Sequence, residues 1–287
     1  MLRATKGKVP DKAQQGLKDT LREQQYFLAC MCIPDEDLHI VSADDIELFE
    51  HAVVREKKML ANDICQLVIE PAMPLYYHAG QFINLRRDAG LVRSYSLASL
   101  PQTDSCLELH IKRFDNGRVS QWLIDELQVG QSVDIQGPYG TCYYSKDKSQ
   151  QNMLLIGTGT GLAPLVGIIK DALFNHHQGE IYLYHGSREL SGLYYQAELS
   201  AIEKRFPQFH YIACLSGEDV PHGIASGRAH DIALAQHKAL KDWRVYLSGI
   251  PVMVTGAKKR AFLAGAKMND IYADPFEMTD LRKASRS

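Results

Sequence analysis

The chain has 287 residues, a length that predicts about two domains at roughly 150 residues each. Hydrophobic residues make up 45% and charged residues 23%, which excludes wholesale disorder and collagen-like repeats. The 32 Lys and Arg residues nearly balance the 34 Asp and Glu residues, and the net charge of -2 argues against a nucleic-acid partner.

Six cysteines are scattered along the chain, and we expect them to be reduced thiols of a cytoplasmic protein because no signal peptide precedes them. The longest uncharged stretch, residues 150–169, raises the question of a membrane span. It contains four glycines and Pro164, and its first third has the pattern of a strand. A buried strand, turn and helix fit it better, so we expect no membrane span.

Residues 1–45 are polar apart from one apolar run at 26–34, which is too little apolar surface to bury a core alone. From about residue 47 the pattern changes to short runs rich in Val, Ile, Leu and Tyr, separated by turn residues. The clearest runs are 80–85, 106–112 and 132–136. They predict an antiparallel β-barrel, interrupted by one helix that starts at Ser120 as N-cap and ends at Gly130.

A polar linker is expected at residues 145–152, and beyond it strands and helices alternate. The predicted strands are 153–156, 180–185, 209–215, 244–247 and 269–273. The predicted helices are 162–174, 193–206, 229–237 and 251–264. This alternation is typical of a parallel sheet with helices on both faces, so we predict a multi-domain chain in which an α/β domain follows the barrel.

A glycine-rich turn, Gly157-Thr158-Gly159-Thr160-Gly161, directly follows the first of these strands and opens the first helix. Glycines let the backbone approach a pyrophosphate, and the helix N-terminus offers free N–H groups and a favourable dipole to an anion. Pro164 follows three residues later, so the spacing departs from the Gly-x-Gly-x-x-Gly fingerprint. By itself the turn is weak evidence, because a tight strand-to-helix turn without a ligand has the same pattern.

The barrel half contains Arg93-Ser94-Tyr95-Ser96 on a predicted strand. An arginine can neutralise a phosphate, an aromatic ring can stack on a flat heterocycle, and a hydroxyl can hydrogen-bond a ring nitrogen. Strand alternation puts Arg93 and Tyr95 on one face. Downstream, Gly117-Arg118-Val119-Ser120 is a second candidate seat for phosphate. Each motif also has a plainer reading, Tyr95 as a strand aromatic and Ser120 as a helix cap.

In this order, the motifs resemble those of the ferredoxin–NADP reductase-like flavoproteins, in particular the reductase components of bacterial multicomponent oxygenases. The resemblance covers about Glu47 to Glu277. It implies an antiparallel six-stranded β-barrel that binds FAD at residues 47–148 and an NAD(P)-binding α/β domain at 150–280.

For the flavin, the resemblance implies Arg93 on the pyrophosphate, Tyr95 stacked on the isoalloxazine and Ser96 near its N5, with Ser94 in the same segment. The strand His110-Ile111-Lys112 and the run Gly117-Arg118-Val119-Ser120 match the segments that hold the ribityl, adenine and phosphate parts of FAD. Gly137-Pro138-Tyr139-Gly140 matches the turn that closes the flavin domain.

For the nicotinamide nucleotide, the resemblance implies contacts from Gly159, Thr160, Gly161 and Pro164, with Thr160 near the flavin. Family members usually carry Cys-Gly-Pro on the strand that faces the nicotinamide, whereas this chain has Ser248-Gly249-Ile250-Pro251. We therefore expect slower or altered hydride transfer at Ser248, with Gly249 as a further cofactor contact.

The C-terminal Asp274-Pro275-Phe276-Glu277 matches the aromatic and carboxylate end that lies close to the flavin in relatives. It makes Phe276 and Glu277 candidate catalytic residues beside Tyr95, Ser96 and Ser248, although Phe276 also fits simple core packing.

The choice between NADH and NADPH depends on charge, because NADPH has a 2′-phosphate that needs cationic or hydroxyl partners. Ser187 and Arg188 stand where the adenosine ribose should lie. NADPH-specific relatives usually add a second arginine on the next strand, where this chain has Ser216-Gly217-Glu218-Asp219. Two carboxylates would repel the extra phosphate, which favours NADH over NADPH.

The run Tyr26 to Cys32 resembles the final ligand segment of a plant-type [2Fe–2S] ferredoxin domain, whose other cysteines precede it in a Cys-x₄-Cys-x₂-Cys run. We interpret residues 1–44 as the C-terminal remnant of such a domain, with Cys30 as the orphaned fourth ligand. A [2Fe–2S] cluster is not expected in the chain as it stands but is expected in a longer form. A disordered tail with two inert thiols is the alternative.

Together these motifs predict an FAD-dependent NAD(P)H oxidoreductase that passes hydride from NADH, or NADPH, to FAD. Single electrons would then pass to an iron–sulfur centre, an oxygenase component or another electron-acceptor protein. One alternative is a flavin or ferric reductase with a diffusible acceptor. Another is a non-catalytic partner subunit that retains the fold, which Ser248 and the missing cluster ligands favour.

Overall fold

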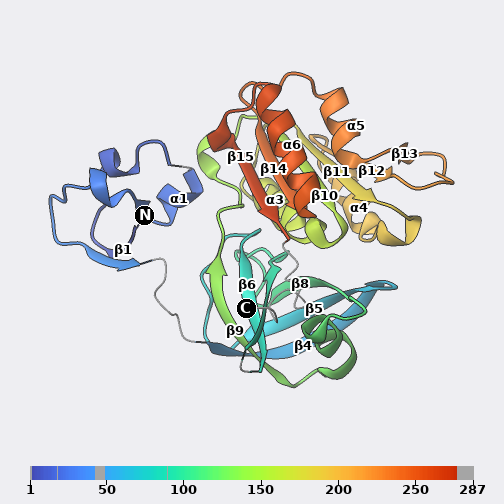
Figure 1. Ribbon diagram of the computed structural model, residues 1–287, viewed down its shortest axis with the longest axis horizontal. Helices are drawn as coiled ribbons and strands as arrows, with labels where there is room; N and C mark the ends of the chain where they lie inside the picture. Colours follow the sequence, from blue (N-terminus) through green and yellow to red (C-terminus); the bar gives the residue numbers. More distant parts are fainter. Residues whose placement is uncertain (1, 18, 43–48, 89, 277–287) are drawn as a thin grey trace, which may run out of the picture.

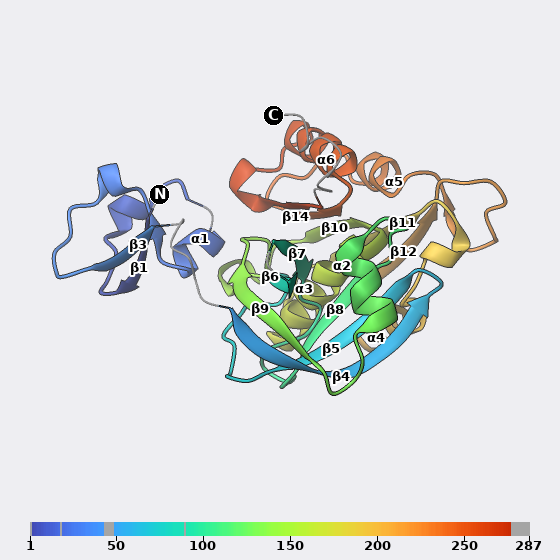
Figure 2. The same cartoon turned by 60° about the horizontal axis from the view of Figure 1, so that its bottom comes forward.

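The computed structural model describes residues 2–17, 19–42, 49–88 and 90–276. In Figure 1 these residues form three parts in chain order: a small N-terminal part, a β-barrel and an α/β part. Each part has its own sheet and its own buried core. The barrel and the α/β part lie against each other in both Figure 1 and Figure 2.

The N-terminal part is a three-stranded antiparallel sheet with short helical turns. Strand β1 (Leu2–Lys6) lies between β2 (Tyr26–Phe27) and β3 (His39–Ser42). The turns are η1 (Asp11–Gln14), α1 (Asp19–Glu23) and η2 (Ala29–Met31). A small buried core is formed by Ala4, Val9, Ala13 and Phe27. The expectation that this segment buries no core is therefore wrong, because strand pairing gathers apolar residues that are far apart in sequence.

Helix α1 attaches this part to the segment that connects the barrel to the α/β part. Thr20 donates from Oγ1 to the Thr141 carbonyl at 2.8 Å, and Gln24 donates from Nε2 to the Gly140 carbonyl at 3.1 Å. Tyr143 donates its hydroxyl to the Thr20 carbonyl. The N-terminal part thus contacts the connection between the two larger parts.

The middle part is the antiparallel six-stranded barrel that the sequence predicts. Its strands are β4 (Glu50–Ala61), β5 (Ile64–Pro71), β6 (Phe82–Asp88), β7 (Leu91–Ser96), β8 (Leu107–Lys112) and β9 (Ser132–Tyr139). They pair in the order β7-β6-β9-β4-β5-β8, and a bridge between Leu97 and Leu109 joins the two ends of the sheet. Alternate side chains fill the barrel, such as Val133 and Ile135 of β9.

One helical segment covers an end of the barrel. Helix α2 (Arg118–Gln121) continues into a π-helical stretch, η3 (Trp122–Glu126), and its apolar side packs into the barrel core. The prediction that Ser120 is the N-cap is wrong, because Gly117 holds that position. The Ser120 hydroxyl instead donates to the Gly117 carbonyl at 3.2 Å and accepts the Phe114 N–H at 3.3 Å, which closes the turn before the helix.

The last part is the predicted parallel sheet with helices on both faces. Its strands are β10 (Met153–Thr158), β11 (Ile181–Ser187), β12 (Phe209–Leu215), β13 (Ala225–Ser226), β14 (Arg244–Gly249) and β15 (Ile271–Pro275). Its helices are α3 (Leu162–Phe174), α4 (Gln196–Arg205), α5 (Ala229–Gln236) and α6 (Pro251–Leu263). Short 3-10 turns are η4 (Lys146–Lys148), η5 (Gly159–Gly161), η6 (Leu190–Gly192) and η7 (Met268–Asp270). Figure 2 shows α5 and α6 on one face and α3 and α4 on the other.

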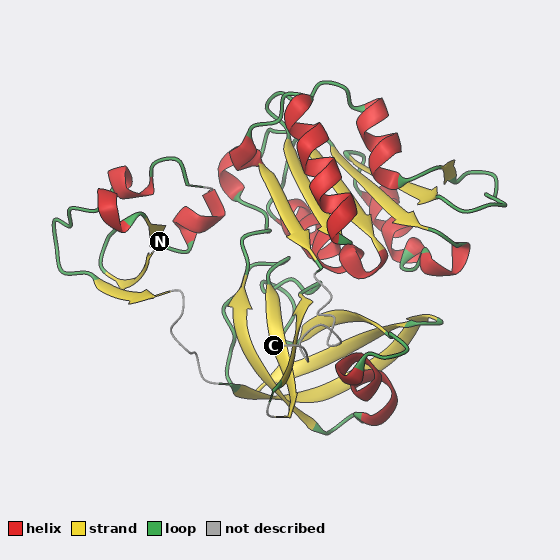
Figure 3. Cartoon of the chain, in the orientation of Figure 1, coloured by secondary structure: helices red, strands yellow, loops and turns green. Residues whose placement is uncertain are grey.

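The strand order in this sheet is β13-β12-β11-β10-β14-β15, so the direction of winding reverses between β10 and β14. In an open α/β sheet, ligands bind outside the carboxyl ends of the strands at such a switch point. Figure 3 shows these carboxyl ends directed toward the barrel.

Two expectations about the α/β part have different outcomes. Residues 150–169 do contain a buried strand, a turn and the start of a helix, namely β10, η5 and α3. The helix predicted from residue 193 begins only at Gln196, because Tyr195 before it has a left-handed φ of 64°. No helix in the described part of the chain is both long enough and apolar enough to cross a membrane.

Candidate active site between the barrel and the parallel sheet

The switch point of the sheet is built from glycines that let two strand ends approach closely. Gly157 of β10 lies opposite Ser248 of β14. A Cβ atom on Gly161 would lie 2.4 Å from the Ser248 carbonyl oxygen. Gly249 has a φ of +129°, and a Cβ atom there would lie 2.3 Å from Thr158 Oγ1. Only glycine allows this approach, which leaves the backbone of the turn open at the carboxyl end of the sheet.

Two hydroxyl groups at this point, Thr158 Oγ1 and Ser248 Oγ, are shielded from solvent and have no hydrogen-bond partner among the residues that the structure describes. An unsatisfied buried polar group costs on the order of 1–3 kcal/mol. Both hydroxyls therefore suit a ligand that brings its own donors and acceptors, such as a carboxamide.

The barrel and the sheet meet in a hydrogen bond beside these hydroxyls. Strand β15 pairs with β14 so that Asp274 lies opposite Ser248. Ser96, the last residue of β7, donates from Oγ to Asp274 Oδ2 at 3.0 Å. Phe276 is held at the same end of the sheet, because its N–H donates to the Gly249 carbonyl at 2.8 Å. The carboxyl end of the parallel sheet therefore faces the end of β7.

Asp274 supplies a carboxylate at this contact between β7 and the parallel sheet. Burial raises its pKa to about 6, and the hydrogen bond from Ser96 offsets that rise only in part. The sequence predicts Glu277 as the carboxylate near the flavin, and Glu277 lies outside the described residues. Asp274 stands directly after the last predicted strand, but its place opposite Ser248 is visible only in the register of β15 with β14.

Strand β7 presents a cation, a hydroxyl and an aromatic ring at this site. Arg93 donates from Nη1 to the Val92 carbonyl at 2.7 Å and forms no ion pair within the described ranges. Ser94 is exposed and donates to Asn84 Oδ1 at 2.7 Å. Tyr95 packs against the barrel core, and burial raises the pKa of its hydroxyl despite the nearby charge of Arg93.

Two protein-family descriptions match the chain at these parts. The Oxidoreductase FAD-binding domain matches residues 51–144, and the Oxidoreductase NAD-binding domain matches residues 155–259. A reductase component of naphthalene 1,2-dioxygenase/salicylate 5-hydroxylase systems from Ralstonia sp. is 33% identical over 257 residues, which cover 88% of this chain and 78% of the relative. The chain belongs to the FAD- and NAD-binding oxidoreductases.

Further relatives match most of the chain in sequence or in fold. The reductase subunit of an Amycolatopsis aromatic O-demethylase is 34% identical over 256 residues, covering 84% of this chain and 76% of the relative. The crystal structure of the Amycolatopsis cytochrome P450 reductase GcoB superposes with a TM-score of 0.74 at 30% identity, covering 96% of this chain and 86% of that one. A ferredoxin reductase in carbazole 1,9a-dioxygenase has a TM-score of 0.71 at 23% identity, covering 96% and 85%, and shows the same fold.

The other predicted FAD residues of the oxidoreductase lie on β8 and at the start of α2. Lys112 pairs with Asp63 at 3.2 Å. Arg118 is exposed and forms no ion pair in the described part of the chain. A Cβ atom on Gly117 would lie 2.2 Å from Ser120 Oγ, so a larger residue here would displace the Ser120 hydroxyl.

Three predicted FAD residues have buried side chains, two inside the barrel and one between the barrel and the α/β part. Ile111 and Val119 belong to the barrel core. The ring of His110 is buried and hydrogen-bonded at both nitrogens, to Glu108 and to Tyr194. These three residues are available to a ligand through their backbone alone.

On the nucleotide side, the predicted residues Gly159, Thr160 and Gly161 form η5, and Gly159 has a φ of +55°. Pro164 is buried in the first turn of α3. Arg188, the residue after β11, is exposed.

The loop after β12 lies against the residues predicted to meet the adenosine ribose. Ser216 donates its N–H to the Ser187 carbonyl at 3.0 Å. A Cβ atom on Gly217 would lie 2.4 Å from the Arg188 carbonyl oxygen. The exposed Glu218 and Asp219 that follow are thereby held near this ribose position.

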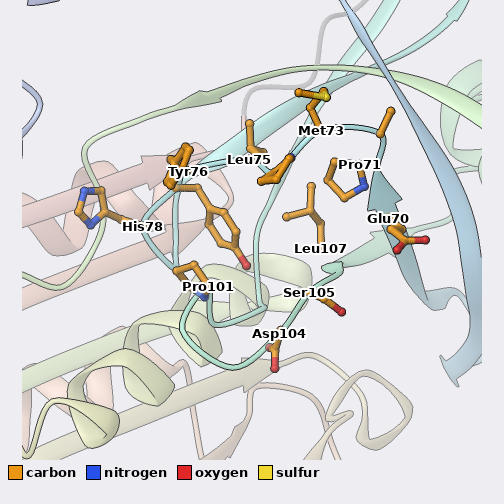
Figure 4. A pocket seen from close by; sticks show the side chains of 13 residues that line it. Glu70, Pro71, Met73, Leu75, Tyr76, His78, Pro101, Asp104, Ser105 and Leu107 are labelled. Atoms are coloured by element: carbon orange, nitrogen blue, oxygen red, sulfur yellow. The ribbon is translucent and has the colours of Figure 1, made fainter.

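A cavity of about 730 Å³ lies away from this interface, on the barrel surface (Figure 4). Its lining comes from the β5–β6 loop and the 101–107 segment, and includes Met73, Tyr76 and Leu107. None of the predicted site residues lines it.

Proposed function

We propose that this chain is the reductase component of an oxygenase system, oxidising NAD(P)H at a bound FAD and delivering electrons to an oxygenase component or another acceptor protein. The observation that carries the proposal is the Ser96–Asp274 hydrogen bond of 3.0 Å. It joins the FAD-binding barrel to the carboxyl end of the NAD-binding sheet, beside the unpartnered Ser248 hydroxyl. The names of the relatives support the acceptor class.

Arg93 and Arg118 would hold the pyrophosphate of FAD. Both guanidinium groups lack an ion pair in the described part of the chain, and α2, which begins at Arg118, contacts β7. Charge-assisted hydrogen bonds from two arginines suit a pyrophosphate. When bound, FAD accepts a hydride and can release its electrons singly, which couples a two-electron donor to one-electron carriers.

Tyr95 would stack on the flavin ring, and Ser96 would face its N5. Because Ser96 gives its own proton to Asp274 Oδ2, the lone pairs of Ser96 Oγ would remain free to accept a hydrogen bond from N5–H, which the flavin ring carries only when it is reduced. Asp274, with a pKa of about 6, holds that hydroxyl in this orientation when it is ionised. Phe276 lies at the same end of the sheet, and the catalytic role of Glu277 stays a prediction from the sequence.

The nicotinamide nucleotide would bind across the glycine turn. The open backbone of Gly159 and Gly161 and the N-terminus of α3 suit its pyrophosphate. The hydroxyls of Thr158 and Ser248 would pair with its carboxamide, which satisfies two otherwise orphaned groups. Serine lacks the polarisable thiol that relatives usually carry here, so transfer is slower than in those relatives.

NADH is the preferred donor in this proposal. Glu218 and Asp219 follow Gly217, whose backbone is packed against that of Arg188. Their charges would repel a 2′-phosphate on the ribose and partly cancel the attraction of the arginine.

The N-terminal part is proposed to be the end of a ferredoxin-type domain that is complete in a longer form. Cys30 is exposed, so its thiol is accessible to a cluster held by cysteines of a preceding segment. All six cysteines are free thiols, which supports a cytoplasmic location. An upstream reading frame without a Cys-x₄-Cys-x₂-Cys run would contradict the ferredoxin part of the proposal.

The test of the main proposal is optical. Purified protein should show flavin absorbance that bleaches on anaerobic addition of NADH and returns when an electron acceptor is added. The proposal would be refuted if the protein could not be reconstituted with FAD. It would also be refuted if the bound flavin stayed oxidised after addition of either NADH or NADPH.

A further inference from the structure

The barrel and the α/β part are in close contact along α3, the helix that begins at the glycine turn. A Cβ atom on Gly167 of this helix would lie 2.8 Å from the Leu97 carbonyl oxygen and 3.1 Å from the Gly80 nitrogen. Leu97 directly follows Ser96, the last residue of β7. The helix that carries the nucleotide turn therefore rests on the backbone that follows the proposed flavin contacts.

Glu108 of β8 is the polar centre of this interface. Its Oε1 accepts from Gln66 Nε2 at 2.7 Å and from His110 Nε2 at 2.9 Å, and its Oε2 accepts from Lys170 Nζ at 3.2 Å. Burial alone would raise its pKa, but the His110 hydrogen bond and the Lys170 charge outweigh burial and hold the pKa at about 2. Glu108 is therefore an ionised, nearly buried carboxylate that receives donors from both parts of the protein.

His110 extends this cluster to a second element of the α/β part. The carboxylate of Glu108 can only accept, so His110 must donate from Nε2, which leaves Nδ1 to accept the Tyr194 hydroxyl at 3.0 Å in the neutral ring. Tyr194 lies just before α4 and is itself buried. Two points of the α/β part, on α3 and before α4, are thus hydrogen-bonded to one strand of the barrel.

The same cluster fixes the chain that leads out of β7. Lys170 donates a second bond from Nζ to the Ala98 carbonyl at 3.1 Å, and the Ala98 N–H donates to the Glu108 carbonyl at 2.9 Å. Ala98 is two residues after Ser96. A change at Glu108 or Lys170 is therefore transmitted through very few bonds to the residue that contacts Asp274.

We propose that Glu108, together with Lys170, is the positioning residue that sets the spacing between the flavin-binding and nicotinamide-binding halves of the site. The inference rests on the proposed function, because the reaction that it concerns is the transfer of hydride from NAD(P)H to FAD. A glutamine at position 108 would keep the shape but replace one acceptor oxygen by an NH₂ group and leave Lys170 without its counter-ion. Loss of one partner of a nearly buried pair loosens an interface far more than loss of an exposed pair.

The experiment compares Glu108→Gln with a matched control, Glu180→Gln. Glu180 accepts from His210 at 2.6 Å, but this pair is exposed and lies within the α/β part. For Glu108→Gln we expect unchanged FAD content and NADH KM, with flavin reduction at saturating NADH slowed by about tenfold or more, because misplacement of reacting groups by about 1 Å can cost ~100-fold. Glu180→Gln should stay within about twofold of the parent, as exposed pairs contribute little.

A second measurement does not depend on turnover. Hydrogen exchange of peptides covering residues 96–100 and 162–174 should accelerate in Glu108→Gln, with and without FAD, and not in Glu180→Gln. Because Glu108→Gln and Lys170→Met both remove the Glu108–Lys170 ion pair, the double variant should slow reduction by clearly less than the product of the two single effects.

Reduction of Glu108→Gln at the parent rate, unchanged exchange in these peptides, or additive losses in the double variant would overturn the inference. Parent protein that binds FAD but is not reduced by NADH or NADPH would overturn the proposed function. The exchange measurement on FAD-free protein would then still decide whether Glu108 holds the two parts together.

Discussion

Replacing Asp274 by asparagine should stabilise the protein at neutral pH while impairing its reaction. The pKa of Asp274 rises from an ordinary 3.8 to about 6 because of burial. In the unfolded chain the carboxyl ionises near pH 4, whereas in the folded chain it keeps its proton to about pH 6. Stability that the protonated carboxyl contributes is therefore fully present below pH 4 and is lost as the pH rises to about 6.

The size of this effect follows from the shift. A rise of about 2 units at ~1.4 kcal/mol per unit corresponds to about 3 kcal/mol at pH 8 and roughly half of that at pH 5. Asparagine does not ionise and keeps an oxygen to accept the Ser96 hydroxyl. The stability advantage of Asp274→Asn over the parent should therefore grow by about 1.5 kcal/mol between pH 5 and pH 8.

Urea denaturation of the FAD-free proteins, followed by circular dichroism at both pH values, measures this difference. The control is Asp242→Asn, since the Lys267 hydrogen bond lowers the pKa of Asp242 and no titration of that group falls between pH 5 and pH 8. An Asp274→Asn advantage that is equal at both pH values, or smaller at pH 8, would refute the argument that burial governs this carboxyl. The variant should also reduce its flavin more slowly, because Ser96 loses an anionic acceptor.

Three further predictions concern the cofactors. Arg93→Ala should weaken FAD binding by about tenfold or more, measured as the ratio of flavin to protein absorbance, and full occupancy would show that the pyrophosphate is misplaced. Ser248→Cys should speed flavin reduction by NADH in stopped-flow measurements, and an unchanged rate would mean that this side chain does not face the reacting ring. Glu218→Arg should raise kcat/KM for NADPH relative to NADH by about tenfold, and an unaltered ratio would remove the charge argument for NADH.

Much of the fold was predictable because turn residues separate short apolar runs. The helix predicted at 162–174 and the strand predicted at 209–215 match α3 and β12 residue for residue. Glycines before the helix and apolar runs in both elements mark these boundaries locally. Boundaries failed where a tertiary contact decided them, as at Ser120, whose hydroxyl closes the preceding turn instead of capping a helix.

The candidate site was predictable only where one segment supplies it. Arg93 to Ser96 and Gly159 to Gly161 could be proposed from short motifs, since each motif lies within one strand or one turn. Asp274 could not be singled out from its neighbours, because its role depends on the register of β15 with β14 and on the approach of Ser96 from another part of the chain.

Strand β8 shows why a sequence pattern alone does not predict which polar side chains are buried. Its residues alternate between apolar and polar, and in an antiparallel barrel such alternation normally predicts that Glu108, His110 and Lys112 face water. In the structure the Glu108 side chain is only 13% exposed and that of His110 is 0% exposed, while Lys112 at 38% still meets solvent. The α/β part covers two of the three polar positions, so what looks like a solvated face is a contact between the barrel and the α/β part.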